Sequence, residues 1–364
     1  MHSDRKIALL HYWLTNMRGG EYVFNEFCSM FPEADIFTHA TIPARLSGAM
    51  LNHKTHESFI AKLPMGRQHC QTYLPLMPLA QRQWDFSAYD LIISSESGPI
   101  KGIRKPKHIM HICYCHSPMR YIWDMYETYY EQASIGGKLA MRIFRKMLQQ
   151  YDMKSAECVD LFIANSKFVR ERIKRVYERN ASVVYPPVDI DYFSLAPQME
   201  RDFFLFVGQL VPYKRPDIVV EAFSALNTEK LVIVGQGPLK RMLQKKATNN
   251  VIFYDNISRE KLRILYASAK ALIFPGIEDF GIVPVEAQAA GCPVIAINAG
   301  GALETVISNK TGIFIKTQTA KEILNAIEEL SYRKFNISFM QQHVRFFEKS
   351  NFQKNITKIL KAYI

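Results

Sequence analysis

FPGIEDFGIVPVEAQAAGCPVIA (residues 274–296) contains the end of a buried strand, a short loop and the start of a helix in one run. The apolar residues that open it predict the strand, and a proline suits the first turn of a helix that begins near Pro284. Glu278 in the loop and Glu286 in the helix can therefore face one ligand. The backbone N–H groups at the helix start can bind a phosphate or sugar oxygen, and they belong to Phe280, Gly281 and Ile282. Two solvated glutamates beside a helix cap are the alternative interpretation.

Short apolar runs of the same kind recur along the chain, and helical patterns such as 216–226 and 320–330 lie between them. Strands are predicted over residues 7–13, 34–38, 91–94, 109–114, 161–164, 183–185, 203–207, 231–234, 251–254, 271–274, 294–297 and 312–315. Alternating strands and helices indicate parallel, doubly wound sheets, and this many strands exceed one ordinary sheet. The 364 residues also suggest about two domains. We therefore predict an α/β protein with two Rossmann-like domains that face each other across a cleft.

The domain boundary is predicted in the proline-bearing segment 185–197, which follows a strand. This divides the chain into a first domain over residues 1–195, a second over residues 196–345 and a final helix over residues 346–364. In open α/β sheets, ligands bind at the carboxyl ends of the strands. Candidate site residues are therefore sought directly after each predicted strand.

The chain is basic, since 46 Lys and Arg against 34 Asp and Glu give a net charge of +12. This charge favours an anionic partner, which can be a nucleic acid, a phosphate-bearing substrate or an acidic membrane. Both halves of the chain are positive, and no helix-turn-helix or aromatic RNA-binding signature occurs. We therefore expect no nucleic-acid partner, and a basic nucleic-acid-binding protein stays a minor alternative.

Composition and cysteine usage indicate a soluble protein. Hydrophobic residues make up 48% and charged residues 22%, as in ordinary globular domains. The first apolar run is too short for a signal peptide, and no stretch reaches the ~18 apolar residues of a membrane span. None of the six cysteines forms a Cys-x-x-Cys pair. We expect a cytoplasmic protein with reduced thiols.

The opening stretch resembles the signature of glycosyltransferase family 4. Glu278 and Glu286 are separated by seven residues, with Phe-Gly between them and Gly-Cys-Pro-Val-Ile after them. The resemblance implies the GT-B fold and a retaining, metal-independent enzyme without a cofactor, whose substrate is a nucleotide sugar. It implies that Glu278 contacts the transferred sugar and Glu286 the nucleotide ribose. It further implies an acceptor-binding first domain, a nucleotide-sugar-binding second domain and a final helix that crosses back to the first domain.

A second family element is the segment 206–216, which follows the first strand of the second domain. Members of the family usually carry Arg after the glycine and Lys further on. This chain has Gln209 at the first position and keeps Lys214, with Arg215 as a possible second charge. Cations here can neutralise the diphosphate leaving group. A solvated loop lysine is the alternative for Lys214.

In the first domain, Gly19 and Gly20 follow the first predicted strand, and glycines let a backbone approach a ligand closely. The pattern is not Gly-x-Gly-x-x-Gly, which disfavours NAD binding. The family uses a glycine loop here against donor phosphate or acceptor. A plain tight turn is the alternative.

Histidines and cysteines crowd residues 108–116, so a zinc site has to be considered. Their spacing differs from that of known structural zinc sites, and a buried strand is the preferred interpretation. We predict no metal site. His116 ends this strand, at a position that the family often uses to contact the sugar, and a structural histidine is the alternative.

The run Met-Arg-Tyr-Ile-Trp-Asp (residues 119–124) resembles bacterial mannosyltransferases that build O-antigen and related surface polysaccharides. The resemblance implies GDP-mannose as donor, a lipid-linked or oligosaccharide acceptor, and acceptor or specificity roles for Arg120, Trp123 and Asp124. A family member that uses a UDP- or dTDP-sugar on another acceptor is the alternative. A non-catalytic relative of the family is a further, minor alternative.

Residues 138–154 predict a basic amphipathic helix. Such a helix can lie on an anionic membrane, or it can simply pack its apolar side onto the protein. The membrane interpretation implies a peripheral protein on the inner face of the cytoplasmic membrane. The sequence does not indicate the oligomeric state.

Overall fold

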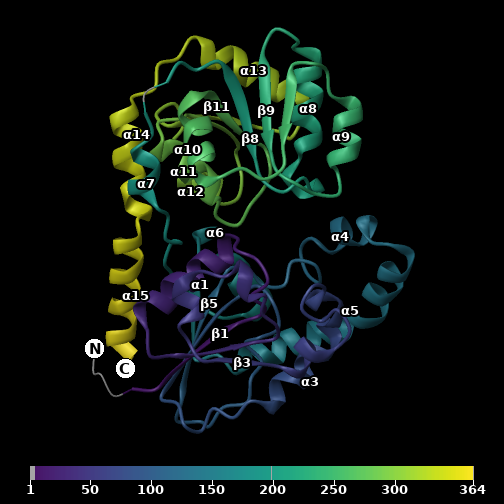
Figure 1. Cartoon of the computed structure of the whole chain (residues 1–364), viewed down its shortest axis with the longest axis vertical. Helices are drawn as coiled ribbons and strands as arrows, with labels where there is room; N and C mark the ends of the chain where they lie inside the picture. Colours follow the sequence, from purple (N-terminus) through teal and green to yellow (C-terminus); the bar gives the residue numbers. More distant parts are fainter. Residues whose placement is uncertain (1–4, 198, 364) are drawn as a thin grey trace. The chain divides into compact units, whose positions relative to one another are not determined.

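The computed structural model describes residues 5–197 and 199–363, which form two compact units that divide between Tyr185 and Pro186. Each unit contains one parallel sheet with helices beside it (Figure 1). The second unit therefore begins ten residues before the predicted start at residue 196. The reason is that α7 (Ile190–Ser194) contacts α11 (Ile282–Ala289) of the second unit.

The sheet of the first unit has the order β3-β2-β1-β4-β5-β6-β7. Its strands are β1 (Ile7–His11), β2 (Asp35–Thr38), β3 (Thr55–Glu57), β4 (Leu91–Glu96), β5 (Met110–Cys115), β6 (Leu161–Ala164) and β7 (Ala181–Val183). The α-helices are α1 (Gly19–Met30), α2 (Gly48–Leu51), α3 (Met77–Ala80), α4 (Tyr126–Gln132), α5 (Ile135–Glu157) and α6 (Lys167–Tyr177). Short 3-10 helices are η1 (Pro43–Arg45), η2 (Phe59–Lys62), η3 (Cys70–Leu76) and η4 (Gln81–Gln83).

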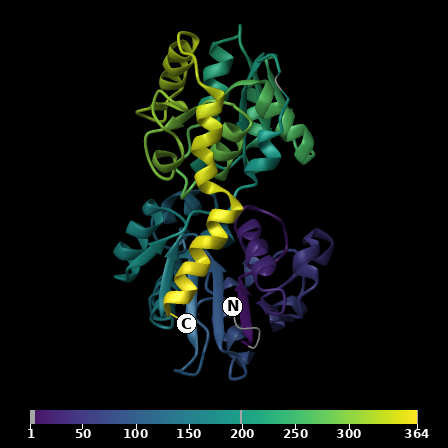
Figure 2. The ribbon, with the colours of Figure 1, turned by 90° about the vertical axis from the view of Figure 1, so that its left-hand side faces the viewer.

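The sheet of the second unit has the order β10-β9-β8-β11-β12-β13. Its strands are β8 (Phe203–Val207), β9 (Lys230–Val234), β10 (Val251–Tyr254), β11 (Ala269–Phe274), β12 (Val294–Ile297) and β13 (Gly312–Ile315). Besides α7 and α11, the helices are η5 (Pro212–Lys214), α8 (Pro216–Ala225), α9 (Lys240–Lys246), α10 (Arg259–Ser268), α12 (Ala302–Thr305), α13 (Ala320–Ser331), α14 (Ile337–Val344), η6 (Arg345–Phe347) and α15 (Lys349–Tyr363). The chain ends with α14, η6 and α15 in succession, and Figure 2 shows this last helical stretch in yellow.

The strands form where apolar side chains can be buried on both faces of a sheet. All six residues of β4 are buried, and the same holds for all four of β12. In the second unit, the core joins strand residues such as Phe204 and Ile295 to helix residues such as Phe223 and Ile323. Continuous apolar runs of this kind are typical of parallel strands.

Each predicted strand overlaps an observed one, although several ends differ by one or two residues, as in β1, which ends at His11 and not at residue 13. Two further corrections fall in the first unit. Strand β7 covers residues 181–183 and not 183–185, because the chain leaves the sheet before Pro186. Strand β3 was not predicted, since its residues Thr-His-Glu are polar and lie at the edge of the sheet. The predicted helix over 138–154 is confirmed within the longer α5, which begins after the N-cap Ser134.

The strand order reverses between β1 and β4 in the first sheet and between β8 and β11 in the second. Ligands of doubly wound sheets bind at the carboxyl ends of the strands beside such a reversal. In the described part of the chain, no helix has the length and apolarity needed to cross a membrane. The path of residues 346–364 back to the first unit stays a prediction.

Candidate active site

In the second unit, the segments after β8 and β11 bring Lys214 and Glu278 together. The Nζ atom of Lys214 donates a hydrogen bond to Oε1 of Glu278 at 2.5 Å. The two side chains are only 12% and 20% exposed, so solvent screens this ion pair weakly. Two of the predicted site residues, separated by 64 positions, therefore form one charged contact at the carboxyl edge of the sheet.

The loop that carries Glu278 is fixed by a glycine turn after β12. The backbone N–H of Gly301 donates to the carbonyl oxygen of Glu278 at 2.8 Å. A Cβ atom on Gly301 would lie 2.3 Å from Cα of Phe280, so only glycine allows this approach. Gly281 has a φ of 92° and serves as the N-cap of α11, which then begins at Ile282. The loop thus holds Glu278 and the start of α11 in a defined position.

Glu286 lies in α11 and accepts a hydrogen bond from the hydroxyl of Tyr266 at 3.0 Å. Burial raises the pKa of Glu286 to about 7, although the hydrogen bond from Tyr266 and the charge of Arg259 oppose this shift. The carboxyl group can therefore change its charge near neutral pH. Tyr266 was not predicted as a site residue, because nothing in its local sequence distinguishes it from other buried tyrosines.

Gln209 and Arg215 flank this edge in different ways. Gln209 is exposed and lies two residues after the end of β8. Arg215 has a positive φ of 54° before α8, and its guanidinium donates to both carboxylate oxygens of Asp217 at 3.0 to 3.2 Å. Arg215 and Asp217 thus form an ion pair, in which the side chain of Arg215 is 31% exposed and that of Asp217 is 37% exposed. A role of Arg215 toward a diphosphate stays a prediction.

In the first unit, His116 follows β5 and its Nε2 lies 2.9 Å from Oγ of Ser95 at the end of β4. Burial and the nearby charges of His11 and Arg120 lower the pKa of His116 to about 3. The imidazole is therefore neutral at physiological pH and can both donate and accept hydrogen bonds. Gly20 lies beside it, since a Cβ atom there would be 3.5 Å from Nε2 of His116.

His11 and Glu21 form an acid–histidine contact that the sequence analysis missed. His11 ends β1 and is fully buried, and its Nε2 lies 3.9 Å from Oε1 of Glu21. Neither ring nitrogen of His11 has a hydrogen-bond partner among the described residues. Glu21 also accepts a hydrogen bond from the backbone of Arg18 at 3.1 Å, which caps α1 where it begins at Gly19. The position of His11 directly at a strand end is the signal that could have identified it.

The three predicted acceptor residues have different surroundings. Arg120 is close enough to influence the pKa of His116. Trp123 donates its indole N–H to Oδ2 of Asp152 at 2.7 Å. Asp124 accepts hydrogen bonds from two arginines of α6, Arg172 and Arg175, at 2.8 and 2.5 Å. The structure thus brings Arg120 to the end of β5, whereas Trp123 and Asp124 contact helices of the first unit.

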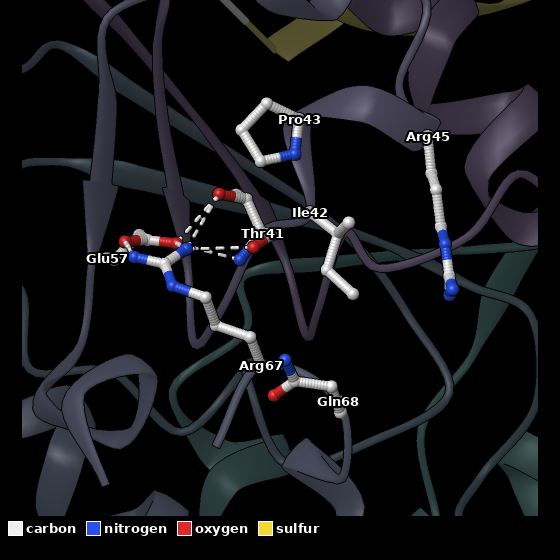
Figure 3. A pocket seen from close by; sticks show the side chains of 7 residues that line it. All are labelled: Thr41, Ile42, Pro43, Arg45, Glu57, Arg67 and Gln68. Carbon is white, nitrogen blue, oxygen red and sulfur yellow. Dashed lines mark hydrogen bonds and ion pairs between the residues drawn. The ribbon is translucent and has the colours of Figure 1, made fainter. Parts of the chain in front are cut away.

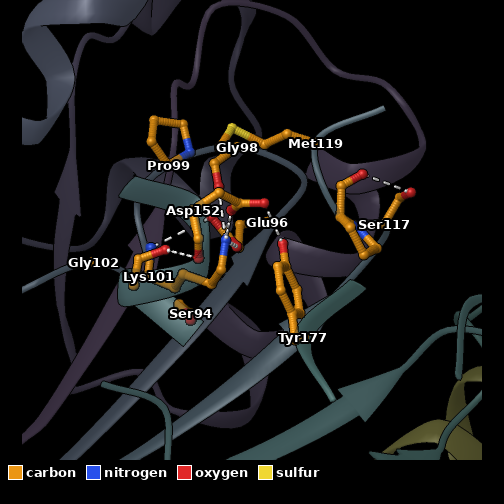
Figure 4. Close-up of polar contacts among 12 residues, drawn as sticks. Ser94, Glu96, Gly98, Pro99, Lys101, Gly102, Ser117, Met119, Asp152 and Tyr177 are labelled. Carbon is orange, nitrogen blue, oxygen red and sulfur yellow. Dashed lines mark hydrogen bonds and ion pairs between the residues drawn. The ribbon is translucent and has the colours of Figure 1, made fainter. Parts of the chain in front are cut away.

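A buried charged cluster underlies this end of the first sheet (Figure 4). Lys101 contacts Oε1 of Glu96 at 3.1 Å and Oδ1 of Asp152 at 2.5 Å, and all three side chains are at most 1% exposed. The hydroxyl of Tyr177 donates to Oδ2 of Asp152 at 2.9 Å. Burial raises the pKa of Glu96 to about 7 against the opposing charge of Lys101. Because Glu96 is the last residue of β4, the cluster fixes the strand end that also carries Ser95.

The histidines and cysteines of residues 108–116 do not converge on one point. His111 lies 2.8 Å from Oγ of Ser94 and 3.3 Å from the carbonyl oxygen of Cys158. Burial lowers its pKa to about 4. Within the described ranges, no group of three or more His, Cys, Asp or Glu side chains has the arrangement of a metal site.

An open cavity of about 510 Å³, lined by apolar as well as charged side chains, lies beside the ends of β2 and β3 in the first unit (Figure 3). Arg45 and Arg67 line it, and Arg67 is held by Oε2 of Glu57 at 2.6 Å. Thr41 also donates to Glu57, through its backbone N–H at 2.7 Å. Arg45 is exposed and donates to the carbonyl oxygen of Thr15 and to Oδ1 of Asn16. The cavity therefore combines two hydrogen-bonded arginines at the same sheet edge as His116.

Two family models match the chain. Residues 18–192 match the model of Glycosyltransferase Family 4, and residues 188–335 match that of Glycosyl transferases group 1. The fold is similar to that of sucrose-phosphate synthase from Thermosynechococcus elongatus, with a TM-score of 0.74 and 19% identity over 98% of this chain and 99% of that one. This likeness and the two parallel α/β sheets confirm the predicted GT-B fold class.

The curated relatives include mannosyltransferases. A GDP-mannose-dependent alpha-(1-6)-phosphatidylinositol monomannoside mannosyltransferase of Mycobacterium tuberculosis is 33% identical over 45% of this chain and 51% of its own length. The alpha-1,3/1,6-mannosyltransferase ALG2 of Dictyostelium discoideum is 26% identical over 75% of each chain. The chain spans about half the length of the first curated relatives that it matches.

Proposed function

The chain belongs to glycosyltransferase family 4, and on that premise we propose that it transfers mannose from GDP-mannose, with retention of configuration, to a hydroxyl of a lipid-linked oligosaccharide in surface polysaccharide or O-antigen biosynthesis. The contact between Lys214 and Glu278 carries the proposal, because it joins the two elements most specific to the family. The two mannosyltransferase relatives support the choice of sugar. The proposed place of action is the cytoplasm, at the inner face of the membrane.

The proposed roles follow from the chemistry of each side chain. Lys214 releases Glu278 and neutralises the diphosphate as it leaves, where negative charge develops. Glu278 then faces the sugar, which gains positive charge as its bond to the diphosphate lengthens. Neutral His116 holds a sugar hydroxyl, and Glu286 accepts hydrogen bonds from the ribose. The departing phosphate takes the proton of the acceptor hydroxyl on the same face, so neither a metal ion nor a covalent enzyme intermediate is needed.

We place the acceptor in the first unit. The open cavity beside Arg45 and Arg67 lies at the edge where β2 and β3 end. Parallel strands present their carboxyl ends at one edge of a sheet, so this cavity and His116 share that edge. Its two arginines suit an acceptor that carries hydroxyls or a phosphate.

A panel of radiolabelled donors tests the proposed function. With a lipid extract as acceptor source, we expect label to transfer from GDP-mannose and not from UDP- or dTDP-sugars. Transfer should persist in EDTA, and the new linkage should keep the α configuration of the donor, as read by nuclear magnetic resonance. Failure of GDP-mannose to give either transfer or hydrolysis would refute the choice of donor, and loss of activity in EDTA would refute the metal-independent mechanism.

Donor binding is expected to depend on pH through Glu286. Its pKa of about 7 lies above the ordinary value of a glutamate, so the carboxyl is mostly ionised at pH 8 and mostly protonated at pH 6. Only the ionised form accepts hydrogen bonds at both oxygens. We therefore expect the affinity for GDP-mannose to fall about tenfold from pH 8 to pH 6, as measured by calorimetry.

The diphosphate of GDP-mannose is doubly esterified and does not titrate in this range, which leaves the protein as the source of the effect. The matched control is Glu286→Gln, whose affinity should be lower and independent of pH. An unchanged pH profile in this variant would assign the titration to another group.

A further inference from the structure

The first half of α5 carries an apolar stripe that the first unit does not cover. Ile135, Leu139, Ile143 and Met147 follow one another at every fourth position and are 91%, 60%, 61% and 41% exposed. Side chains four residues apart lie on one face of a helix. The residues of α5 that are buried, such as Leu148 and Asp152, lie on the opposite side. Apolar stripes of this size on a surface indicate a binding site.

Positive charge surrounds the stripe. From Gln132 to Tyr151 the chain contains Lys138, Arg142, Arg145 and Lys146 and no acidic residue. At 100° per residue, Arg142 and Lys146 fall on the same side of the helix as Ile135 and Leu139. The outward face of α5 is therefore apolar and cationic at once, which is the composition of helices that lie in a membrane interface.

Helix α4 contacts three cations of α5 through two tyrosines. The guanidinium of Arg145 lies 3.6 Å from the ring centre of Tyr126, and that of Arg142 lies 5.2 Å from the ring centre of Tyr130. The ammonium of Lys138 lies 5.6 Å from the same Tyr130 ring. These cation–π contacts orient the charges without neutralising them. Figure 1 shows α4 and the start of α5 at the periphery of their unit.

We propose that the outward face of α5, defined by Ile135, Leu139, Ile143 and Met147 with Arg142 and Lys146, docks onto an anionic lipid bilayer. Anionic headgroups match the cations, while the interfacial acyl region accepts the apolar stripe. A second copy of this chain fits less well, because two such faces would bring their cations together. Docking itself does not require sugar transfer, but its purpose, access to a lipid-linked acceptor, rests on the proposed function.

Co-sedimentation of the full-length protein with vesicles tests the proposal. We expect binding to equal parts of phosphatidylcholine and phosphatidylglycerol at low salt, weaker binding at high salt, and little binding to phosphatidylcholine alone. The triple variant Ile135→Gln, Leu139→Gln, Ile143→Gln should weaken binding at least about tenfold. The charge variant Arg142→Gln, Lys146→Gln should lower both the affinity and its salt dependence.

Matched controls distinguish the effect of this surface from general effects of charge and hydrophobicity. Leu51→Gln removes an apolar side chain that is 52% exposed, and Lys174→Gln with Lys321→Gln removes two exposed cations elsewhere. Both controls should bind vesicles as the parent protein does, and all variants should retain transfer to a water-soluble acceptor.

Two outcomes would overturn the proposal. One is that the parent protein does not bind anionic vesicles, or that the triple variant binds them as well as the parent does. The other is concentration-dependent self-association that the triple variant abolishes while vesicle binding is absent, which would make this face an interface between two copies. Vesicle binding without any sugar transfer would leave docking intact and refute only the proposed function.

Discussion

Glu278→Gln is expected to lower sugar transfer by about 10²–10³-fold while the protein stays folded. The substitution keeps the size of the side chain and its hydrogen bond to Lys214, but it removes the negative charge that lies 2.5 Å from the ammonium. The sugar carbon gains positive charge in the transition state, so the lost carboxylate acts mainly on turnover and little on donor affinity. Initial rates with GDP-mannose, together with calorimetric donor binding, separate these two quantities.

The matched control is Glu221→Gln, which alters an exposed glutamate of α8 in the same unit and should leave the rate unchanged. Lys214→Met tests the other member of the pair, and it should also lower turnover because the diphosphate loses its cation. Residues that act together show non-additive effects, so the double variant should be little slower than the worse single one. If the folded Glu278→Gln protein kept the parental turnover, Glu278 would have no role in the reaction.

The sheets could be predicted from the sequence because parallel strands buried on both faces are continuous apolar runs. Strand β12, with Val-Ile-Ala-Ile, is such a run, and it was found with the correct bounds. Strand β3 was missed because an edge strand needs little apolar surface, and its Thr-His-Glu sequence resembles a loop. The domain boundary depended on the packing of α7 against α11, which no local pattern reveals.

The sequence predicted which site residues follow strands, but it did not predict which side chains they contact. Lys214 and Glu278 were both expected at the carboxyl edge, and the structure adds that they touch. The partner of Trp123 is Asp152, 29 positions away, and the contact exists only because α5 returns along the unit. Arg215 was expected to act on a diphosphate, whereas in the structure its guanidinium binds Asp217. Spacing alone carries no information on such choices between competing partners.

Lys101→Met is expected to destabilise the first unit by about 3–5 kcal/mol, because it leaves two buried carboxylates without their cation. Lys101 is fully buried and contacts both Glu96 and Asp152. Burial opposes its charge, but the two carboxylates raise its pKa above the ordinary value of a lysine. Urea unfolding, monitored through hydrogen exchange of the backbone amides of β4 and β5, reports the stability of the first unit separately from that of the second.

The surface lysine Lys230 offers the matched control, since it pairs with Asp202 where both side chains are more than half exposed. Lys230→Met should leave the urea midpoint unchanged, because solvent screens an exposed pair. Restoring neutrality in the core by adding Glu96→Gln and Asp152→Asn to Lys101→Met should recover part of the lost stability. Full stability of Lys101→Met alone would show that the carboxylates tolerate the loss of the lysine.

The destabilisation of Lys101→Met should also depend on pH, with a sign set by Glu96. Its pKa in the folded protein, about 7, lies above the ordinary value of 4.5, so the folded state holds more protons than the unfolded state between these values. Stability contributed by this group therefore falls as pH rises from about 4.5 to 7. Removing Lys101 raises the pKa of Glu96 further, which extends the fall to higher pH. The variant should accordingly lose more stability relative to the parent at pH 8 than at pH 6, and a pH-independent difference would mean that removing Lys101 leaves the pKa of Glu96 unchanged.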